Sequence, residues 1–360
     1  MSRVLFLVNH DVVIYNFRLE LVEELLKQNH DVFISCPYGE RIDDLVKLGA
    51  IHKDIVIERH GTNPFKDLKL IKQYKRLIKE VRPDIIFSYT IKPNIYGAIA
   101  ARKCGVPCVA NVTGLGIAFQ GGGLKQKICI ALYKNAFKKV QRVFFQNTDN
   151  QSFFVKHKIA IGKHKLLPGS GVNVNRYLPT PLPKNDVFLF IARIMKDKGI
   201  DLYLEAAKRV KAIHSNIEFY VCGFCDDENY TQILSGYEKD GIIKYFGMVR
   251  NTTDYYSRSS CIVLPSYHEG MSNTLLEAAS CERPLIASNI PGCKEAIEDN
   301  KTGFLIELGN VDDLYEKMIS FVNLSYDEKT EMGKKGRKKI INEFDRKIVV
   351  NEYLKEMACD

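Results

Sequence analysis

The chain has 360 residues, 46% of them hydrophobic and 26% charged, which is an ordinary composition for a folded globular protein. This length exceeds the roughly 250 to 300 residues at which one hydrophobic core stops growing, so we expect two domains. No apolar run reaches about 18 residues, and the first one, 4–8, is too short for a signal-peptide core. The sequence therefore predicts a cytoplasmic protein without a membrane-spanning helix.

Charge is unevenly distributed along the chain, whose formal net charge is +9. Residues 1–167 carry 27 Lys and Arg against 14 Asp and Glu, whereas residues 168–360 carry 25 against 29. A basic half favours a nucleic acid, an anionic membrane or a polyanionic substrate as its partner, and a solvated basic face is the alternative. The ten cysteines are scattered, and the only Cys-x2-Cys pair, Cys222 and Cys225, lacks the second pair expected of a zinc site.

Apolar, β-branched runs alternate with helical stretches in the first half of the chain, which is typical of a parallel α/β sheet. The expected strands are 4–8, 32–35, 85–88, 107–111 and 143–146, with helices at 16–27, 42–48, 68–81, 94–104 and 124–138. A glycine- and proline-rich stretch, 167–183, then predicts a linker.

The same alternation restarts after the linker. The expected strands are 187–192, 218–222, 244–246, 261–264, 285–288 and 303–306, with helices at 202–214, 230–239, 254–257, 273–281, 313–321 and 328–342. We therefore predict an α/β fold of two doubly wound, Rossmann-like domains, 1–167 and 168–343, followed by a helical segment, 344–360. Because ligands of such sheets bind at the carboxyl ends of the strands, the active site is expected in a cleft that the two domains share.

A phosphate-site layout follows the apolar run 261–264: a polar turn and then a helix for which Ser272 is a good N-cap. Glu269 lies before this helix and Glu277 inside it, so a bound phosphate would be flanked by two acceptors for sugar hydroxyls. The Glu-x7-Glu spacing resembles the signature of family 4 type retaining glycosyltransferases, which have two facing Rossmann-like domains, the GT-B architecture. The resemblance implies that Glu269 contacts the donor sugar, Glu277 the nucleotide ribose, and that the turn residues between them line the site: Gly270, Met271, Ser272 and Asn273.

Other stretches of the second half extend this resemblance. Arg193 and Lys198 follow strand 187–192 in the family's Arg-x4-Lys-Gly pattern, which implies that both neutralise the departing diphosphate. Met248 and Val249 lie where the family holds the nucleotide base, and Glu295 in a loop close to the donor; Glu295 as a helix-start carboxylate is the alternative. No Asp-x-Asp occurs in the chain, so we expect neither a metal nor another cofactor.

The first strand lacks Gly-x-Gly-x-x-Gly, which disfavours a nicotinamide or flavin dinucleotide. The glycine pair of many family members is also replaced, and His10, Asn16 and Arg18 are the candidates for anion contact instead. A core-facing Tyr15 or Phe17 with a surface Arg18 is the alternative.

Stretches 89–97 and 111–119 resemble a subgroup that builds bacterial capsule and O-antigen polysaccharide on lipid-linked, polyprenyl-diphosphate acceptors. Lys92, Asn94 and Thr113 are the acceptor candidates that this implies. The family also implies that the C-terminal helix returns to the first domain, although a helix on the second domain is possible from sequence alone. A glycine loop, 121–123, precedes a basic segment that is expected to lie on the inner face of an anionic cell membrane, with a merely solvated set of lysines as the alternative: Lys125, Lys127, Lys134, Lys138 and Lys139.

The sequence thus predicts a metal-independent, retaining hexosyltransferase that uses a UDP-sugar, with front-face attack implied by the resemblance and a covalent intermediate not excluded. A sugar-nucleotide epimerase of the same architecture would act without an acceptor. A nucleic-acid-binding protein would explain the basic half but not the glutamates, and no recognition module for nucleic acid is present.

Overall fold

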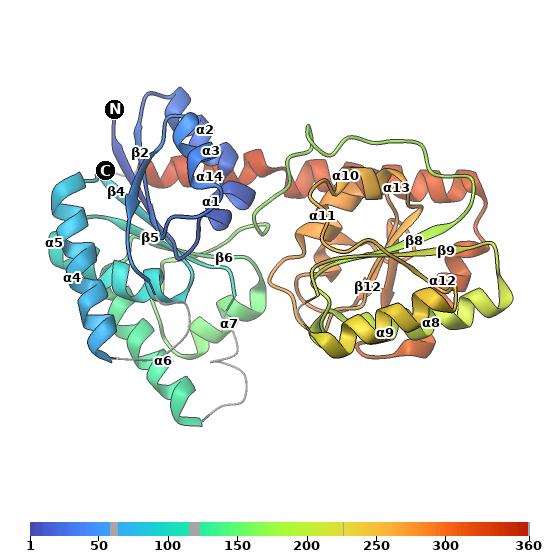
Figure 1. Ribbon diagram of the computed structural model, residues 1–360. Coiled ribbons are helices and arrows are strands. Elements are labelled where there is room, and N and C mark those ends of the chain that lie inside the picture. Colours follow the sequence, from blue (N-terminus) through green and yellow to red (C-terminus); the bar gives the residue numbers. More distant parts are fainter. Residues whose placement is uncertain (58–63, 115–122, 226, 359–360) are drawn as a thin grey trace. The chain divides into compact units, whose positions relative to one another are not determined.

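The computed structural model describes residues 1–57, 64–114, 123–225 and 227–358 (Figure 1). The chain divides into two compact units, residues 1–170 with 348–360 and residues 171–347. Both units are α/β, and each is built on a twisted sheet whose paired strands run parallel.

The sheet of the first unit has seven strands in the order β3-β2-β1-β4-β5-β6-β7. The direction of strand addition reverses between β1 and β4, which makes the carboxyl ends of these two strands the topological switch point of the sheet. The strands are β1 Arg3–Leu7, β2 Asp31–Cys36, β3 Ile51–Asp54, β4 Ile85–Tyr89, β5 Cys108–Val112, β6 Arg142–Phe145 and β7 His164–Leu166.

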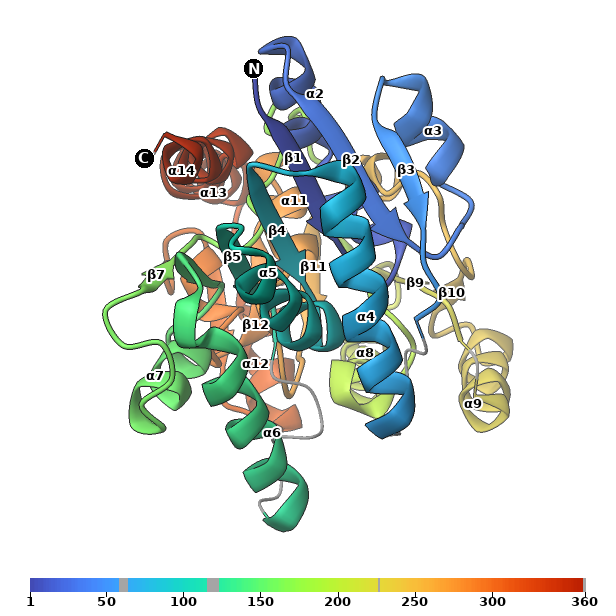
Figure 2. The same cartoon turned by 90° about the vertical axis from the view of Figure 1, so that its left-hand side faces the viewer.

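Helices cover both faces of this sheet, which is why its central strands read as continuous apolar runs. Alternate residues of β1 enter two different cores. Leu5 and Leu7 pack with residues of α4 (Pro64–Val81), α5 (Ala98–Cys104) and α6 (Gly123–Ala136), whereas Val4 and Phe6 pack with residues of α2 (Leu19–Lys27), α3 (Ile42–Lys47) and α14 (Arg346–Met357). Figure 2 shows these helices around the sheet. The helices are α1 Asp11–Phe17, α2 Leu19–Lys27, α3 Ile42–Lys47, α4 Pro64–Val81, the π-helix η1 Pro93–Gly97, α5 Ala98–Cys104, α6 Gly123–Ala136, the 3-10 turn η3 Phe137–Lys139 and α7 Thr148–Lys156.

The second unit has a six-stranded sheet in the order β10-β9-β8-β11-β12-β13, with its switch point between β8 and β11. Its strands are β8 Val187–Ile191, β9 Glu218–Cys222, β10 Lys244–Tyr245, β11 Cys261–Leu264, β12 Leu285–Ser288 and β13 Gly303–Ile306. Its helices are η4 Lys196–Lys198, α8 Ile200–Ile213, α9 Glu228–Lys239, α10 Thr253–Ser257, α11 Asn273–Ser280, η5 Lys294–Ala296, α12 Val311–Val322 and α13 Tyr326–Phe344.

The predicted elements differ from the structure in several places, and helix α7 and most of α1 have no counterpart in the prediction. The helix expected at 16–27 is two helices, because Arg18 between them has a non-helical backbone (φ −138°, ψ 11°). Strands β3 and β7 are missing from the prediction, since both are short edge strands whose polar residues obscure the apolar pattern. The helix expected at 94–104 begins as the π-helix η1.

The C-terminal helix α14, Arg346–Met357, packs against the first sheet from residue 348 onward. Tyr353 is fully buried, with its ring edge-on to Phe87 and Phe144 at centroid distances of 5.0 and 5.1 Å. Further along α14, Glu356 Oε1 lies 2.8 Å from Nε of Arg142 at the start of β6. The helix is therefore part of the first unit's core, as the family resemblance implied.

Replacing Tyr353 with alanine should lower the free energy of unfolding of the first unit by about 3 to 5 kcal/mol, because it empties an aromatic-lined position in the core. Denaturant unfolding of the purified chain measures this change. Tyr38→Ala is the matched control, since Tyr38 is 64% exposed in the same unit. Equal unfolding midpoints for the two variants would contradict the role given to α14.

Candidate active site

The turn between β11 and α11 forms the centre of the candidate site in the second unit. Helix α11 begins at Asn273 with Ser272 as its N-cap, as the sequence predicted, and Ser272 Oγ accepts from the backbone N–H of Leu275. The turn is fixed by a second loop, because the Ser272 N–H donates to the carbonyl of Gly292 at 2.8 Å. Gly292 has φ +87°, and a Cβ there would lie 2.8 Å from the Gly270 carbonyl oxygen. The two loops are thus in direct backbone contact.

Glu269 and Lys198 form an ion pair at the switch point of this sheet. Glu269 Oε1 lies 2.6 Å from Lys198 Nζ and accepts from Ser266 Oγ at 3.0 Å. The side chains of Glu269 and Lys198 are only 12% and 18% exposed. The sequence placed both residues in one site, and the structure brings their charged atoms into contact.

A glycine permits this approach. Gly199, directly after Lys198, has φ +74°, and a Cβ at this position would lie 2.0 Å from the Pro265 carbonyl oxygen. Any larger residue would push the loop after β8 away from the loop after β11. The backbone N–H of Tyr267 also donates to the Asp197 carbonyl at 2.9 Å, so the two loops are joined on both sides of the ion pair.

Arg193 differs from Lys198 in its exposure. Its side chain is exposed at the end of β8, and within the described ranges it has no ion-pair or hydrogen-bond partner. The free guanidinium can form a bidentate contact with a phosphate, whereas Lys198 already shares its charge with Glu269.

Glu277 has its own set of partners. Tyr256 OH, itself fully buried, donates to Glu277 Oε2 at 2.9 Å. Burial raises the pKa of the Glu277 carboxyl, and the hydroxyls of Tyr256 and Tyr177 with the Arg346 and Arg176 guanidinium groups offset part of this rise. Sequence reasoning missed these two tyrosines, because nothing near Glu277 in the chain points to them.

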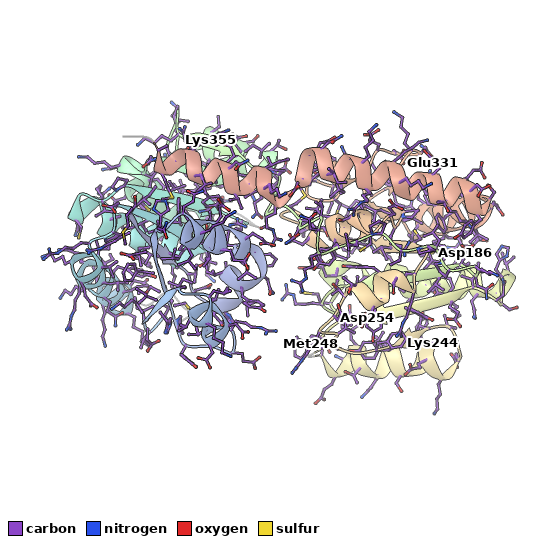
Figure 3. The ribbon with its side chains drawn as sticks, turned by 90° about the horizontal axis from the view of Figure 1, so that it is seen from above. Asp186, Lys244, Met248, Asp254, Glu331 and Lys355 are labelled. Carbon is purple, nitrogen blue, oxygen red and sulfur yellow. The ribbon has the colours of Figure 1, made fainter. Side chains whose placement is uncertain are left out.

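The remaining residues that the sequence predicted to bind the sugar donor differ in their exposure and partners. Glu295 Oε2 accepts from the backbone N–H of Gly292 at 2.7 Å and thereby stabilises its own loop, while Met271 is buried. Met248 is 74% exposed after β10, where its side chain points outward (Figure 3), so its backbone is what remains for a ligand; Val249 beside it is half-buried. Asn273 Oδ1 is buried and has no hydrogen-bond partner among the residues that the structure describes.

Two polar residues of the first unit, expected to contact the acceptor or an anion, instead hold its core together. Arg18 is 3% exposed, lies over the rings of Tyr89 and Tyr353, and donates from Nε to Tyr353 OH at 3.0 Å. Asn94 is 1% exposed and donates to the Asn111 carbonyl at 2.7 Å. Both expectations are corrected by burial, because a side chain enclosed by aromatic rings and strands has almost no surface for a ligand.

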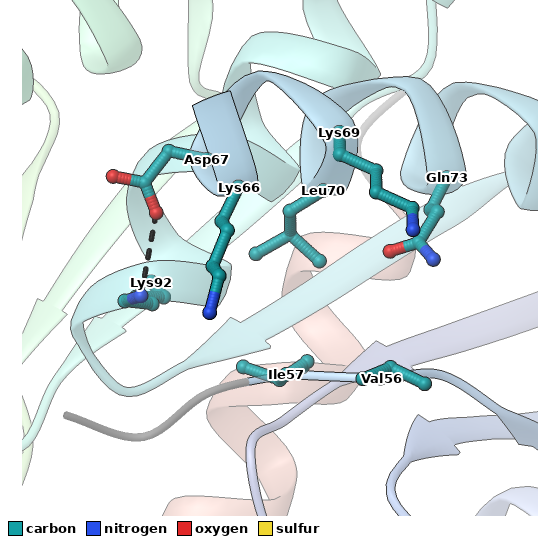
Figure 4. A pocket seen from close by; sticks show the side chains of 8 residues that line it. All are labelled: Val56, Ile57, Lys66, Asp67, Lys69, Leu70, Gln73 and Lys92. Atoms are coloured by element: carbon teal, nitrogen blue, oxygen red, sulfur yellow. Dashed lines mark ion pairs between the residues drawn. The ribbon is translucent and has the colours of Figure 1, made fainter. Parts of the chain in front are cut away.

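The other candidates of the first unit are less buried than Arg18 and Asn94. His10 is the N-cap of α1, and its Nδ1 lies 2.5 Å from the carboxylate of buried Asp11. Asn16 is exposed and Thr113 half-buried beyond β5. Lys92 lines a cavity, where its Nζ lies 3.3 Å from Asp67 Oδ1 (Figure 4).

Two family models match the chain. "Glycosyl transferases group 1" matches residues 179–339, and "Glycosyl transferase 4-like" matches residues 3–147. The chain therefore belongs to the glycosyltransferases, with a 4-like first domain and a group 1 second domain, and its two Rossmann-like units are those of the GT-B architecture.

Particular relatives and structures are similar over almost the whole chain. An N,N'-diacetylbacillosaminyl-diphospho-undecaprenol alpha-1,3-N-acetylgalactosaminyltransferase of Campylobacter jejuni is 28% identical, with 98% of this chain and 97% of that protein covered. A UDP-Gal:alpha-D-GlcNAc-diphosphoundecaprenol alpha-1,3-galactosyltransferase of Escherichia coli is also 28% identical, over 91% and 88%. Among solved structures, a Rickettsia africae glycosyltransferase superposes with a TM-score of 0.83 at 20% identity, covering 99% of this chain and 97% of that one. Anabaena HepE in complex with UDP and glucose gives 0.82 at 16%, covering 99% of both chains.

The raised pKa of Glu277 leads to a pH prediction. A carboxylate that accepts from ribose hydroxyls must be ionised, and its ionised form is lost as the pH falls through the raised pKa. UDP affinity, measured by calorimetry, should therefore decline well before the pH reaches about 4.3, the ordinary glutamate value. Glu277→Gln should bind UDP more weakly and without this decline, and Tyr256→Phe should move the decline to higher pH. An unchanged profile in both variants would refute this assignment.

Proposed function

We propose that this glycosyltransferase moves a sugar, with retention at the anomeric carbon, from a UDP-sugar to a saccharide on a polyprenyl diphosphate. The observation that supports a sugar-nucleotide donor is the contact between Lys198 and Glu269 at the switch point of the group 1 domain. Arg193 follows the strand β8 of the same switch point and is exposed. The acceptor half rests on the Campylobacter and Escherichia coli relatives, which are named for undecaprenol-diphosphate-linked acceptors.

The site suggests how each group would act. Arg193, Lys198 and the first N–H groups of α11 would offset the charge of the diphosphate, so we propose that no metal is required. Glu269 would hold the donor sugar, and Glu277 the ribose. The phosphate of a bound donor would compete with Glu269 for Lys198. This competition would place the Lys198 ammonium group beside the phosphate oxygen of the bond that breaks.

The reaction itself is a single exchange at C1 of the sugar. The bond from C1 to the diphosphate oxygen breaks, and its electron pair stays on that oxygen. The acceptor hydroxyl attacks the same face of C1, and its proton passes to the departing phosphate oxygen. Protein groups therefore stabilise charge and position the reactants, rather than supplying a base.

The transfer reaction can be tested directly with a panel of UDP-sugars and lipid-linked acceptors, with products analysed by mass spectrometry in the presence of EDTA. Glu269→Gln and Arg193→Ala should each lower the transfer rate by about 10² to 10³, because each removes an interaction with the transition state.

Glu331→Gln is the matched control, since Glu331 is exposed on α13 (Figure 3) and should leave the rate unchanged. Consumption of the donor without an acceptor would favour an epimerase. Full transfer by Glu269→Gln would refute the site, and loss of activity in EDTA would refute metal independence.

We further propose peripheral attachment to an anionic membrane through α6. Leu124 and Ile128 are 74% and 50% exposed beside Lys125 and Lys127, a combination suited to the headgroup region of a bilayer. The expected amphipathic stripe is shorter than the sequence suggested, because Phe137 is buried and Ile130 and Leu132 pack partly into the core. Residues 121–122 of the glycine loop and 115–119 of the second subgroup stretch lie outside the described residues.

Within the described part of the chain, no helix is both long enough and apolar enough to cross a membrane. Attachment would then depend on charge, with each lysine near an anionic leaflet contributing about 1 kcal/mol.

The chain should sediment with anionic liposomes but not neutral ones, and salt should release it because the Debye length is only about 10 Å at 0.1 M. Charge reversal of five exposed lysines should abolish binding: Lys125, Lys127, Lys134, Lys138 and Lys139. The control reverses five exposed lysines of the second unit and should still bind: Lys208, Lys239, Lys334, Lys335 and Lys338. Equal sedimentation of the two variants would contradict attachment through α6.

A further inference from the structure

The stretch that the sequence predicted as a linker, 167–183, belongs to the second unit from residue 171 onward and reaches the side chain of Glu277. Tyr177 lies in this stretch and is 7% exposed. Its ring is edge-on to the ring of Tyr256, with a centroid distance of 6.3 Å. Tyr256 OH donates to Glu277 Oε2 at 2.9 Å, so two tyrosines from different parts of the chain meet at one carboxylate.

Helix α11 binds Tyr177 through both its side chain and its backbone. The Tyr177 hydroxyl is hydrogen-bonded to the Glu277 carboxylate. Ser280 follows Glu277 by three residues on the same helix, so their side chains lie on the same side of it. Ser280 Oγ, which is fully buried, donates to the Tyr177 carbonyl at 2.8 Å. The helix that contains Glu277 therefore also fixes the backbone of the tyrosine that binds this carboxylate.

Two arginines attach the linker to the rest of the second unit. Arg337, on α13, donates from Nη1 to the Tyr177 carbonyl at 2.9 Å. Arg283 is fully buried and donates from Nη1 to the Thr180 carbonyl at 2.9 Å and from Nε to the Tyr256 carbonyl at 2.6 Å. Because the donors of a guanidinium group form a rigid fork, Arg283 sets the position of the linker relative to α10, the helix of the second tyrosine.

The two tyrosines leave Glu277 able to bind a ligand. An ionised carboxylate has about four acceptor sites, so it can accept from two tyrosine hydroxyls and still accept from the hydroxyls of a ribose. Hydrogen bonds from two fixed donors also restrict rotation of the carboxylate, which sets the direction of its remaining lone pairs.

We propose that Tyr177 is a positioning residue of the donor site: its hydroxyl orients the Glu277 carboxylate toward the ribose of the nucleotide. Ser280 and Arg337 hold Tyr177 in this position through its backbone carbonyl. This inference rests on the proposed function, because it takes Glu277 as the ribose ligand. The linker is then a part of the nucleotide site as well as a connection between two units.

Calorimetry with UDP and with 2′,3′-dideoxy-UDP tests this role, using Tyr177→Phe, which removes only the hydroxyl. The variant should bind UDP about tenfold more weakly, the effect of one lost hydrogen bond to a charged group. It should bind dideoxy-UDP as tightly as the unchanged protein does, because that ligand has no ribose hydroxyl for Glu277 to accept from. A merely structural role would weaken both nucleotides alike.

Tyr203→Phe is the matched control. Tyr203 is also fully buried in the second unit, and its hydroxyl donates to the Phe188 carbonyl at 2.9 Å. This variant loses a buried hydrogen bond elsewhere, so it should be less stable but should bind both nucleotides normally. In a Glu277→Gln background, Tyr177→Phe should cause no further loss of UDP affinity, since the group through which it acts has been removed.

Three results would overturn the positioning role. The first is unchanged UDP affinity in Tyr177→Phe, and the second is an equal loss of affinity for UDP and dideoxy-UDP. The third is a full further loss in the Glu277→Gln background, which would mean that Tyr177 acts on the nucleotide without Glu277.

The positioning role and the transferase proposal can fail separately. If sugar is transferred to a lipid-linked acceptor but Tyr177→Phe weakens the two nucleotides equally, the positioning role fails alone. If no transfer occurs while Tyr177→Phe still weakens UDP selectively, the transferase proposal fails and the role of Tyr177 in nucleotide binding stands.

Discussion

The contact between Lys198 and Glu269 unites the second unit's two central loops, and the candidate site depends on it. The residues are 71 positions apart in the chain and meet because β8 and β11 are neighbours at the switch point of a parallel sheet. Coulomb attraction alone would not position them, since a Cβ at position 199 would clash with the Pro265 carbonyl and keep the two loops apart. Gly199 avoids that clash, and Gly292 does the same for the loop on the other side of the turn. Two glycines thus determine where a cation and a carboxylate can act together.

The first unit also has a parallel sheet, but the polar side chains at its strand ends bond within the core. At the carboxyl ends of its central strands, Arg18 lies against the rings of Tyr89 and Tyr353, and Asn94 joins β4 to β5. Tyr353 enters the same cluster from the C-terminal helix, so the end of the chain is part of the core of this unit. The surface is left with lysines on α4 and α6, which is where the positive charge of the first half becomes available to ligands.

Both units pair a lysine with a carboxylate. In the second unit, the cation Lys198 is balanced by a carboxylate, which limits repulsion and leaves Arg193 to receive an anion. In the first unit, Lys92 is paired with Asp67, with its Nζ 3.3 Å from Oδ1.

The sequence by itself determined the two α/β units and the N-cap of α11, because alternating apolar runs and a short motif encode these locally. The grouping of Lys198 with Glu269, which are 71 positions apart, was predicted only through the resemblance to a known family. The sequence could not determine which polar residues face a ligand. Arg18, Asn94 and Lys92 are all polar residues near strand ends, yet only Lys92 lines a cavity. Tertiary structure decided this, since Arg18 is enclosed by a tyrosine 335 positions away and Glu277 is held by tyrosines from other elements. Burial is set by packing between distant segments, which no local pattern records.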